Sequence, residues 1–303
     1  ILLCCCVLWQ TVFLPKPPKP AAAFPLVKAP TTRKPRKLYV LVNPKGGTKG
    51  AQAIYDKVVK PGLDAGGIEH QKIETEYAGH GKVLCNTLPV GNDSGFDAIV
   101  AIGGDGTFHE CVNGMLDRTD GTRCPIGLIP GGSGNSFLTD FGLGKDPKAA
   151  VDNIVAGRLA GIDATRCVFG PDDVKHHLWS INVIGYCADH CMGAVNIDGW
   201  RGCLGTARYD ICALWGLLKG RTSREVSVKV DGSEWTKGVG AVFINTTQHF
   251  GKGMRAAPEA RLDDGLADVG SIKGSISHSL RLFSLIKTGQ HAALSDSIQA
   301  KEM

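Results

Sequence analysis

The hydrophobic pattern of the first half of the chain alternates between short apolar runs and longer amphipathic stretches. Continuous apolar runs of this kind are typical of buried parallel strands, and the stretches between them suit helices. Strands that alternate with helices predict an α/β fold, with a Rossmann-like parallel sheet covered by helices on both faces. The predicted strands cover residues 38–42, 68–75, 98–102 and 126–129, and the predicted helices cover residues 51–63, 81–88 and 108–116, with one more helix after the last strand.

The second half of the chain has a different pattern, with strand candidates and one long helix candidate at residues 204–218. Residues 226–230 alternate valine with Ser227 and Lys229, which gives one buried and one solvated face. This pattern predicts a mainly antiparallel β-sandwich. We place the domain boundary near Gly161, so that an α/β domain spans residues 38–160 and a β-rich domain spans residues 161–303. The other predicted strands cover residues 179–184, 239–245 and 267–272.

Residues 1–37 read as an apolar stub and a linker. The first 14 residues are apolar but too short to span a bilayer, which needs about 20. They fit a remnant of a signal sequence or of a membrane anchor, and Cys4, Cys5 and Cys6 fit palmitoylation sites. The seven prolines of residues 15–37 favour extended chain. Since the chain begins with isoleucine, we expect its start to be missing.

Charge is concentrated in that linker. The formal net charge of the chain is +5, and residues 1–37 hold seven Lys and Arg residues and no acid, so the remainder is close to neutral. The basic segment suits either a solvated linker or attraction to an anionic membrane surface. The folded part lacks the basic and aromatic pattern of nucleic-acid binders, so we expect no nucleic-acid partner. We expect a cytoplasmic protein that associates peripherally with membranes.

The cysteines lie singly in or beside apolar segments, which is typical of small buried hydrophobic residues in a reducing compartment rather than of a disulfide framework. The 40 glycines are about 13% of the chain, against a typical ~7%. Many loops are therefore expected to approach a neighbouring group closely or to adopt positive φ angles.

Three glycine loops each follow a predicted strand at its carboxyl end, where ligands bind in open α/β sheets. Glycine allows backbone amides to come close to phosphate oxygens, and the amino terminus of a following helix adds a favourable partial charge. Any one loop can be an ordinary tight turn, but three after strands of one domain indicate a nucleotide site. The loops are Asn43-Pro44-Lys45-Gly46-Gly47-Thr48-Lys49-Gly50, Gly103-Gly104-Asp105-Gly106-Thr107 and Pro130-Gly131-Gly132-Ser133-Gly134-Asn135.

Other nucleotide and hydrolase motifs do not match. The chain has no GxxxxGK[ST] stretch, and no GxGxxG opens a helix with an acid about twenty residues later. The stretch from Gly131 to Asn135 resembles GxSxG, but Asn135 stands where the last glycine would be.

Asp105 is the candidate catalytic residue. It lies between glycines at the end of an apolar strand. Phosphoryl transfer needs a carboxylate that orients and deprotonates the acceptor hydroxyl. The simpler interpretation is that Asp105 caps a helix that begins near Phe108, and both roles are compatible.

These motifs resemble the diacylglycerol kinase catalytic domain, which sphingosine kinases, ceramide kinases, bacterial lipid kinases and, more distantly, NAD kinases share. The resemblance covers about residues 38–291. It rests on the three loops, on the segment 75–80, and on the stretch 264–269, which reads DGLADV. The stretch Gly103-Gly104-Asp105-Gly106-Thr107, continued by His109-Glu110-Cys111-Val112-Asn113-Gly114, carries most of it.

The resemblance implies roles for individual residues. Asp105 matches the general base, and Asp189 resembles the aspartate that holds the polar head of a sphingoid base in sphingosine kinases. Arg208 matches an arginine that contacts phosphate, and Arg201 is a looser match to a second one. Nucleotide contacts are implied for Asn43, Pro44, Lys45, Gly46, Gly47, Thr75, Gly103, Gly104, Gly106, Thr107, Glu110, Gly131, Gly132, Ser133, Gly134 and Asn135.

ATP and Mg²⁺ are the implied cofactors. The family has an Asp-Gly-Glu segment that helps to hold the Mg²⁺, after the region that matches Gly289-Gln290-His291. It is not found here, and Asp231-Gly232-Ser233 is a poor substitute because it lies earlier and lacks the second acid. We expect a fragment or a shortened chain, and we assign no metal ligands.

The resemblance implies an ATP-dependent lipid kinase that phosphorylates the primary hydroxyl of a sphingoid base. Asp189 and the segment 204–209 favour that substrate. The alternatives are a diacylglycerol, ceramide or broad-specificity lipid kinase, an NAD kinase, and a catalytically inactive membrane-binding module. We expect a lipid substrate and contact with a membrane surface.

Overall fold

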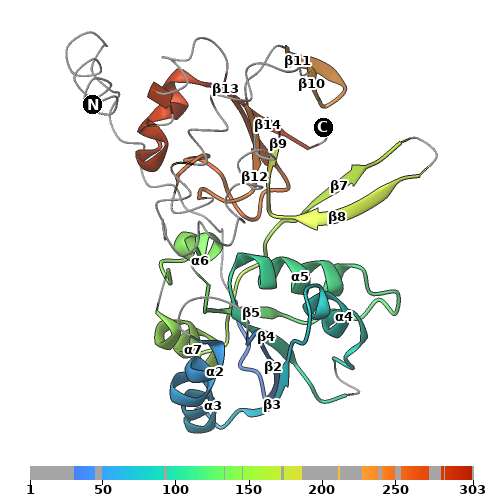
Figure 1. Ribbon diagram of the computed structural model, residues 1–303, viewed down its shortest axis with the longest axis vertical. Coiled ribbons are helices and arrows are strands. Elements are labelled where there is room, and N and C mark those ends of the chain that lie inside the picture. The colour runs from blue at the N-terminus through green and yellow to red at the C-terminus, as the bar shows by residue number, and fades with distance from the viewer. Residues whose placement is uncertain are drawn as a thin grey trace. The chain divides into compact units, whose positions relative to one another are not determined.

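The computed structural model forms two compact units (Figure 1). The first comprises Leu26–Ile181 with Leu262–Asp264, and the second comprises Asn182–Arg261 and Gly265–Met303 together with Ile1–Pro25. The first unit continues about twenty residues past the predicted boundary near Gly161. The structure describes residues 31–44, 50–91, 94–132, 134–144, 146–171, 174–185, 211, 227–237, 241–249, 254–272, 281–282 and 284–301.

A parallel sheet forms the centre of the first unit, as the alternating pattern predicts. Its strand order is β3-β2-β4-β5, so the chain starts in the interior of the sheet and strands are added on both sides. All three pairings are parallel. The strands are β2 (Lys37–Val42), β3 (Glu69–Glu74), β4 (Ala98–Gly103) and β5 (Ile126–Pro130).

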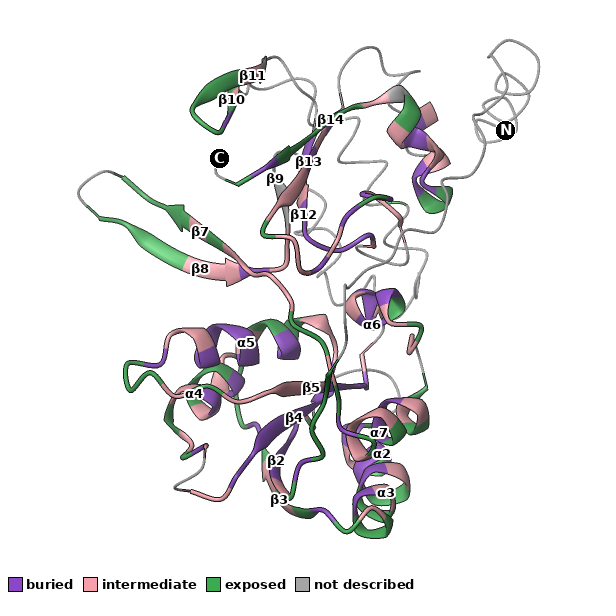
Figure 2. Cartoon of the chain, turned by 180° about the vertical axis from the view of Figure 1, so that it is seen from behind, coloured by how far each residue is buried: buried purple, intermediate pink, exposed green. Residues whose placement is uncertain are grey.

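Two hydrophobic cores cover the two faces of this sheet (Figure 2). Successive side chains of a strand point to opposite faces. On β2, Leu38, Val40 and Val42 join one core, while Tyr39 and Leu41 join the other. The apolar runs of the sequence are continuous because both faces of these strands are buried.

Helices supply the outer layer of each core. One face carries the stretch 51–65, which runs as α2 (Ala51–Ile54), a π-helical turn (Tyr55–Val59) and α3 (Lys60–Ala65), and it also carries α7 (Pro147–Val155). The opposite face carries α4 (His80–Thr87) and α5 (Asp105–Leu116). The short helix α6 (Ser136–Asp140) follows the third glycine loop.

The start of α5 differs from the prediction. The helix begins at Asp105, with Gly104 as its N-cap residue, and not near Phe108. Asp105 therefore lies in the first turn and is not the N-cap residue. A carboxylate in the first turn still interacts favourably with the helix dipole, so the two positions are hard to separate from sequence alone.

A hairpin follows the sheet in the first unit. Its strands are β7 (Thr165–Phe169) and β8 (His176–Ser180), and they pair antiparallel. The single strand predicted for residues 179–184 is wrong, because β8 ends at Ser180 and β9 (Asn182–Gly185) starts a different sheet. A separate two-stranded pairing joins β1 (Thr31–Thr32) to β6 (Arg158–Leu159).

The second unit contains antiparallel sheets, as predicted. A four-stranded sheet has the order β14-β13-β12-β9, and β10 pairs with β11. The predicted helix at residues 204–218 lies outside the described residues, apart from Ile211. The remaining strands are β10 (Ser227–Val230), β11 (Ser233–Lys237), β12 (Ala241–Asn245), β13 (Ala267–Ile272) and β14 (Asp296–Ala300).

Four cysteines of the described part of the chain are free: Cys85, Cys111, Cys124 and Cys167. Cys85 and Cys111 are fully buried. Burial raises the pKa of the Cys124 thiol to about 12. These three side chains pack in the core beside α4 and α5, as the sequence pattern indicates. Among the described residues, no helix has the length and apolar character needed to cross a membrane.

Candidate active site

The described parts of the three glycine loops follow β2, β4 and β5 at the carboxyl edge of the parallel sheet (Figure 1). Asn43 follows β2, and its backbone amide donates a hydrogen bond to the carbonyl of Ile102 on β4. Its side-chain Nδ2 donates to Oγ1 of Thr107 at 3.2 Å. Asn43 is thereby joined to the end of β4 by one hydrogen bond and to the second loop by another.

The second and third loops are joined through backbone groups. The amides of Gly131 and Gly132 both donate to the carbonyl of Gly103, at 2.8 and 3.1 Å. Thr75 follows β3 and is buried, and its amide donates to the carbonyl of Val42. The described parts of all four strand ends therefore lie along one edge, as the sequence analysis predicts.

Close backbone packing explains several of the glycines. A Cβ atom on Gly132 would lie 2.5 Å from the Cα atom of Gly104, and one on Gly103 would lie 2.5 Å from Oγ1 of Thr107. A side chain at Gly132 would push the second and third loops apart, and one at Gly103 would collide with Thr107 of its own loop. Gly106, by contrast, has open space around it.

Asn135 holds the third loop in a tight conformation. It has a φ of 54°, in the left-handed region that non-glycine residues rarely adopt. Its Oδ1 accepts a hydrogen bond from the amide of Gly132, and its Nδ2 donates to the carbonyl of the same residue. Asparagine tolerates this backbone conformation better than most residues because its short side chain can bond locally. The position that rules out a GxSxG motif thus has a structural role.

Asp105 lies in the first turn of α5, and its carboxylate reaches the start of α6. Oδ2 accepts a hydrogen bond from the amide of Ser136 at 3.0 Å, and Oδ1 accepts one from the amide of Phe137 at 3.3 Å. A Cβ atom on Gly134 would lie 3.3 Å from Oδ2, so the absence of a side chain there leaves room beside the carboxylate. The side chain is half-buried and oriented by two backbone donors.

Glu110 is engaged in a different contact. Its Oε1 accepts from the amide of Gly79 at 2.9 Å, and its Oε2 accepts from the amide of Gly81 at 3.1 Å. Gly79 is the N-cap residue of α4, so both carboxylate oxygens satisfy amides at the amino terminus of that helix. The nucleotide contact implied for Glu110 remains a prediction.

Two family models match this chain. Residues 37–167 match the diacylglycerol kinase catalytic domain, and residues 188–301 match the YegS C-terminal NAD kinase beta sandwich-like domain. The chain belongs to the diacylglycerol kinase and sphingosine kinase superfamily of lipid kinases.

Curated relatives of the family carry both names. Sphingosine kinase 1 of Arabidopsis thaliana is 39% identical over 192 residues, which cover 61% of this chain and 38% of that protein. The diacylglycerol kinase of Mycobacterium tuberculosis H37Rv is 32% identical over 206 residues, which cover 67% of this chain and 63% of that protein. The chain thus spans well under half the length of the plant sphingosine kinase.

Solved structures support the fold. A structure of a putative diacylglycerol kinase from Bacillus anthracis has a TM-score of 0.64 and 22% sequence identity, and the match covers 89% of this chain and 85% of that one. At this identity the likeness establishes the fold alone.

Several residues implied by the family resemblance lie outside the described residues. They comprise part of the first loop, one residue of the third loop, and the three positions of the β-rich half. Their implied roles stay predictions. The residues are Lys45, Gly46, Gly47, Ser133, Asp189, Arg201 and Arg208.

The use of Mg²⁺ can be tested against the side chains present. Among the described residues, no group of three or more His, Cys, Asp or Glu side chains is placed to hold a metal ion. The oxygens of Asp105 and Glu110 accept hydrogen bonds from helix amides. The described residues therefore do not form a metal site by themselves, and the use of Mg²⁺ remains a prediction.

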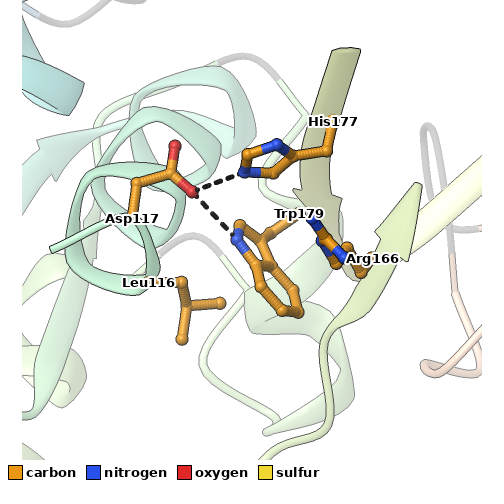
Figure 3. A pocket seen from close by; sticks show the side chains of 5 residues that line it. All are labelled: Leu116, Asp117, Arg166, His177 and Trp179. Carbon is orange, nitrogen blue, oxygen red and sulfur yellow. Dashed lines mark hydrogen bonds and ion pairs between the residues drawn. The ribbon is translucent and has the colours of Figure 1, made fainter. Parts of the chain in front are cut away.

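Sequence reasoning assigned no role to Asn113, although it lies in the quoted family motif. The residue is buried, and its Nδ2 donates to the carbonyl of Trp179 while its Oδ1 accepts from the amide of the same residue, both at 2.8 Å. Asp117, the C-cap residue of α5, accepts a hydrogen bond from the indole Nε1 of Trp179 (Figure 3). The sequence signal that could have revealed this role is a polar residue, Asn113, on the face of α5 that packs against the core.

Asp117 is the centre of a charged cluster in a recess of about 470 Å³ (Figure 3). Its Oδ1 accepts from Trp179 Nε1 at 3.0 Å and lies 3.2 Å from His177 Nε2, and its Oδ2 lies 2.6 Å from Lys82 Nζ. Burial alone would raise the pKa of Asp117, but its hydrogen bonds to Lys82, His177 and Trp179 outweigh burial and lower the pKa. The cluster fastens β8 to α5.

Proposed function

We propose that the protein is an ATP-dependent lipid kinase that transfers the γ-phosphoryl group to a lipid hydroxyl. The observation that carries the proposal is the placement of Asp105. Its carboxylate lies between the second and third glycine loops, at the edge of the sheet where open α/β folds bind ligands, and two backbone amides orient it. Family membership supports the same reaction.

The geometry suits a general base. A carboxylate offers about four lone-pair directions, and the amides of Ser136 and Phe137 each use one. Each oxygen therefore retains the capacity to accept a hydrogen bond from a substrate hydroxyl. A fixed carboxylate can then orient that hydroxyl and take its proton as the oxygen attacks the γ-phosphorus.

The glycine loops suit the phosphate groups of ATP. Their backbones pack closely at Gly103, Gly104 and Gly132, and Gly106 leaves open space beside Asp105. Phosphoryl transfer relies mainly on positioning and on electrostatic stabilisation, which backbone amides can supply without side chains. Mg²⁺, when bound with ATP, would neutralise developing charge on the phosphates.

A sphingoid base is the substrate that we propose. The support is the similarity to plant proteins named sphingosine kinases and the position of Asp189, a carboxylate suited to a cationic amine and a hydroxyl. The similarity to a protein named diacylglycerol kinase favours the alternative, a diacylglycerol or broad-specificity kinase.

The deciding experiment is Asp105→Asn in the full-length enzyme, assayed with labelled ATP and with sphinganine, diacylglycerol and ceramide as separate substrates. Loss of the base is expected to lower kcat about 10²–10⁴-fold, because general-base catalysis is typically worth that much. The KM for ATP is expected to change little.

A matched control separates the loss of the Asp105 carboxylate from a general effect of changing an aspartate to asparagine. Asp152→Asn makes the same chemical change at an exposed carboxylate of α7 that pairs with Lys148. It should leave kcat unchanged. Full activity of Asp105→Asn would remove Asp105 from the mechanism, and wild-type protein that phosphorylates none of the three lipids would contradict the proposed function.

A further inference from the structure

A second pocket lies within the β-rich unit, on one face of the β12–β13–β14 sheet. Its volume is about 310 Å³, which is within the range of small-molecule sites. The sheet side is lined by Phe243 and Asn245 of β12, residues 268–271 of β13 and Ser297 of β14, and the opposite side is lined by residues 256–259, 289–293 and 295. All of these residues belong to the same unit.

The strand register places the sheet residues of the pocket on a common face. Phe243 lies opposite Gly270, and Asn245 lies opposite Asp268. Residues directly opposite each other in an antiparallel pair project to the same side of the sheet. Phe243, Asn245, Asp268 and Gly270 therefore share one face of two paired strands, and this face forms the floor of the pocket.

Gly270 keeps this floor open. It lies inside β13, where glycine weakens a strand and often marks a place that a ligand approaches. Its φ is not in the left-handed region, and a Cβ atom there would have no neighbour nearer than 4.0 Å. Neither backbone conformation nor packing requires glycine at this position.

Asn245 presents unused hydrogen-bonding groups. The residue is 1% exposed, and neither its Nδ2 nor its Oδ1 has a hydrogen-bond partner among the described residues. Buried polar side chains nearly always have partners, because an unpaired one is costly. A whole carboxamide without partners at the floor of a pocket indicates that something else supplies them.

His291 adds a third unused group from the opposite side. The residue is 3% exposed, and its Nε2 lies 3.0 Å from the carbonyl of Ala256. That carbonyl can only accept, so we assign the ring proton to Nε2 and leave Nδ1 as an acceptor, which has no partner. Burial lowers the pKa of His291, so the ring is neutral near pH 7.

These groups define the chemistry of an occupant. It must donate to Nδ1 of His291 and both donate to and accept from Asn245. The lining residues include the carboxylates of Glu259 and Asp268 and neither lysine nor arginine, so an anion is disfavoured. A hydroxyl both donates and accepts without charge. An occupant with several hydroxyls meets these requirements best.

We propose that this pocket binds a polyol group, either free or carried on a lipid. The inference concerns the β-rich unit alone and does not rest on the proposed kinase activity.

The test uses the full chain without ATP and measures binding by saturation-transfer NMR. The probes are glucose, octyl glucoside below its critical micelle concentration, and inorganic phosphate. Both sugars are expected to bind with millimolar dissociation constants, in line with the small number of atoms engaged. Equal affinity would assign the site to free polyols, and at least tenfold tighter binding of octyl glucoside would assign it to polyol-bearing lipids. Inorganic phosphate should not displace either sugar, even if it binds at the glycine loops of the first unit.

Substitutions then locate the binding. Gly270→Val fills the floor without backbone strain, and Asn245→Leu removes the carboxamide while keeping its branching. Each should weaken sugar binding at least tenfold. Asn245→Leu should also leave the melting temperature unchanged or raise it by a few degrees, because an unpaired buried group is removed. Ser227→Ala, an exposed change on β10, is the control and should alter neither quantity.

Two results would overturn the proposal. One is the absence of sugar binding to the wild-type chain, which would leave water as the occupant. The other is sugar binding that Gly270→Val does not weaken. If the valine variant does not fold, Gly270→Ala adds one methyl group and serves the same comparison.

Discussion

Asp105 and Glu110 lie on the same helix, and each carboxylate accepts hydrogen bonds from two backbone amides, yet the two side chains differ in what surrounds them. Glu110 accepts from two amides at the amino terminus of α4 and is closely packed there, because a Cβ atom on Gly81 would lie 2.9 Å from its Oε2. Asp105 is bordered by Gly106 and Gly134, which leave space around it. Space beside a fixed carboxylate is what distinguishes a candidate base from a helix cap.

Gly106 gives a residue-scale test of the nucleotide site. It is exposed, it lies in the first turn of α5, its φ is not positive, and a Cβ atom there meets nothing within 4 Å. Gly106→Ala should therefore stabilise the protein by up to about 1 kcal/mol, because alanine loses less backbone entropy than glycine in a helix. If the loop holds ATP phosphates, the same methyl group should raise the KM for ATP several-fold.

Thermal unfolding and ATP titration of one preparation measure both effects. Gly121→Ala is unsuitable as a control because Gly121 has a φ of 72°. Gly161→Ala is suitable, because nothing lies within 4 Å of its Cβ position and its φ is not in the left-handed region. A stabilised Gly106→Ala variant with an unchanged KM for ATP would show that this side of Asp105 does not face the nucleotide.

Helix α5 both presents the candidate base and anchors strand β8. Its first turn carries Asp105, and its later turns carry Asn113 and the flanking Asp117, both of which hold Trp179 of β8. The contact lies entirely within the first unit. The position of β8 is thereby tied to the helix that presents the candidate base.

Asn113→Leu tests this attachment. The leucine leaves the amide and the carbonyl of Trp179 without their partners, and each buried group without a partner costs about 1–3 kcal/mol. We expect the free energy of unfolding of the first unit to fall by about 2–4 kcal/mol. Urea unfolding followed by Trp fluorescence measures it.

Asn153→Leu is the matched control for that variant. Asn153 lies on α7 and donates to the carbonyl of Ala149 in its own helix, and its Oδ1 accepts from the guanidinium of Arg158, an exposed side chain that water can satisfy instead. A loss below about 1 kcal/mol is expected there. Equal losses for both variants would mean that the Asn113 contact with β8 adds nothing beyond an ordinary helix hydrogen bond.

Sequence reasoning predicts an element well when a single physical cause, such as burial on both faces, determines its hydrophobic pattern. The strands β2 and β4 are buried on both faces, so their apolar runs define them to within one residue. The break at Ile181 was missed because the residues on both sides have strand character, and only tertiary structure sends β8 and β9 into different sheets. Strand β14 was missed because four of its five residues are exposed.

The candidate site was predictable in part for a related reason. Glycine loops after strands must gather at one edge of a parallel sheet, so their proximity follows from the fold class. The sequence does not tell that Gly132 packs on Gly104, that Glu110 caps α4 or that Asn113 holds Trp179, because these contacts join segments distant in the chain. A sequence motif locates the candidate site, but only the contacts in the structure show whether a given residue of the motif is open to a ligand or holds the fold.

At the scale of the whole molecule, stability should depend on pH in two steps. Burial lowers the pKa of His291, so below the unfolded value of about 6.5 the unfolded chain binds more protons than the folded one. Stability is then lost as the pH falls from about 6.5 towards the folded pKa of the histidine. His109 has a pKa lowered mainly by burial and should add to the same step.

The second step belongs to carboxylates. Burial alone would raise the pKa of Asp97, but hydrogen bonds from the amide and the guanidinium of Arg36 outweigh it and lower the pKa. Stability from Asp97 is present above the unfolded value of about 3.8 and is lost as the pH falls through the folded pKa. Urea midpoints between pH 8 and pH 3 measure both steps. His291→Phe should shrink the first step and spare the second, and a first step of unchanged size would contradict the assignment.

Substrate choice is also a property of the whole molecule, and Asp189 is the residue on which we expect it to depend. If its carboxylate pairs with the amine of a sphingoid base, Asp189→Ala should lower kcat/KM for sphinganine and leave diacylglycerol much less affected, because diacylglycerol has no cation. A charge-assisted hydrogen bond is worth about 1.5–3 kcal/mol, which corresponds to roughly 10–150-fold in specificity. The measurement is kcat/KM for each lipid in mixed micelles, for wild type and variant, in the full-length enzyme. Asp152→Ala, which changes an exposed aspartate of α7 that pairs with Lys148, is the control and should alter neither value. Equal losses on both lipids for Asp189→Ala would mean that this residue supports the fold or the shared hydroxyl, and the diacylglycerol or broad-specificity alternative would then be favoured.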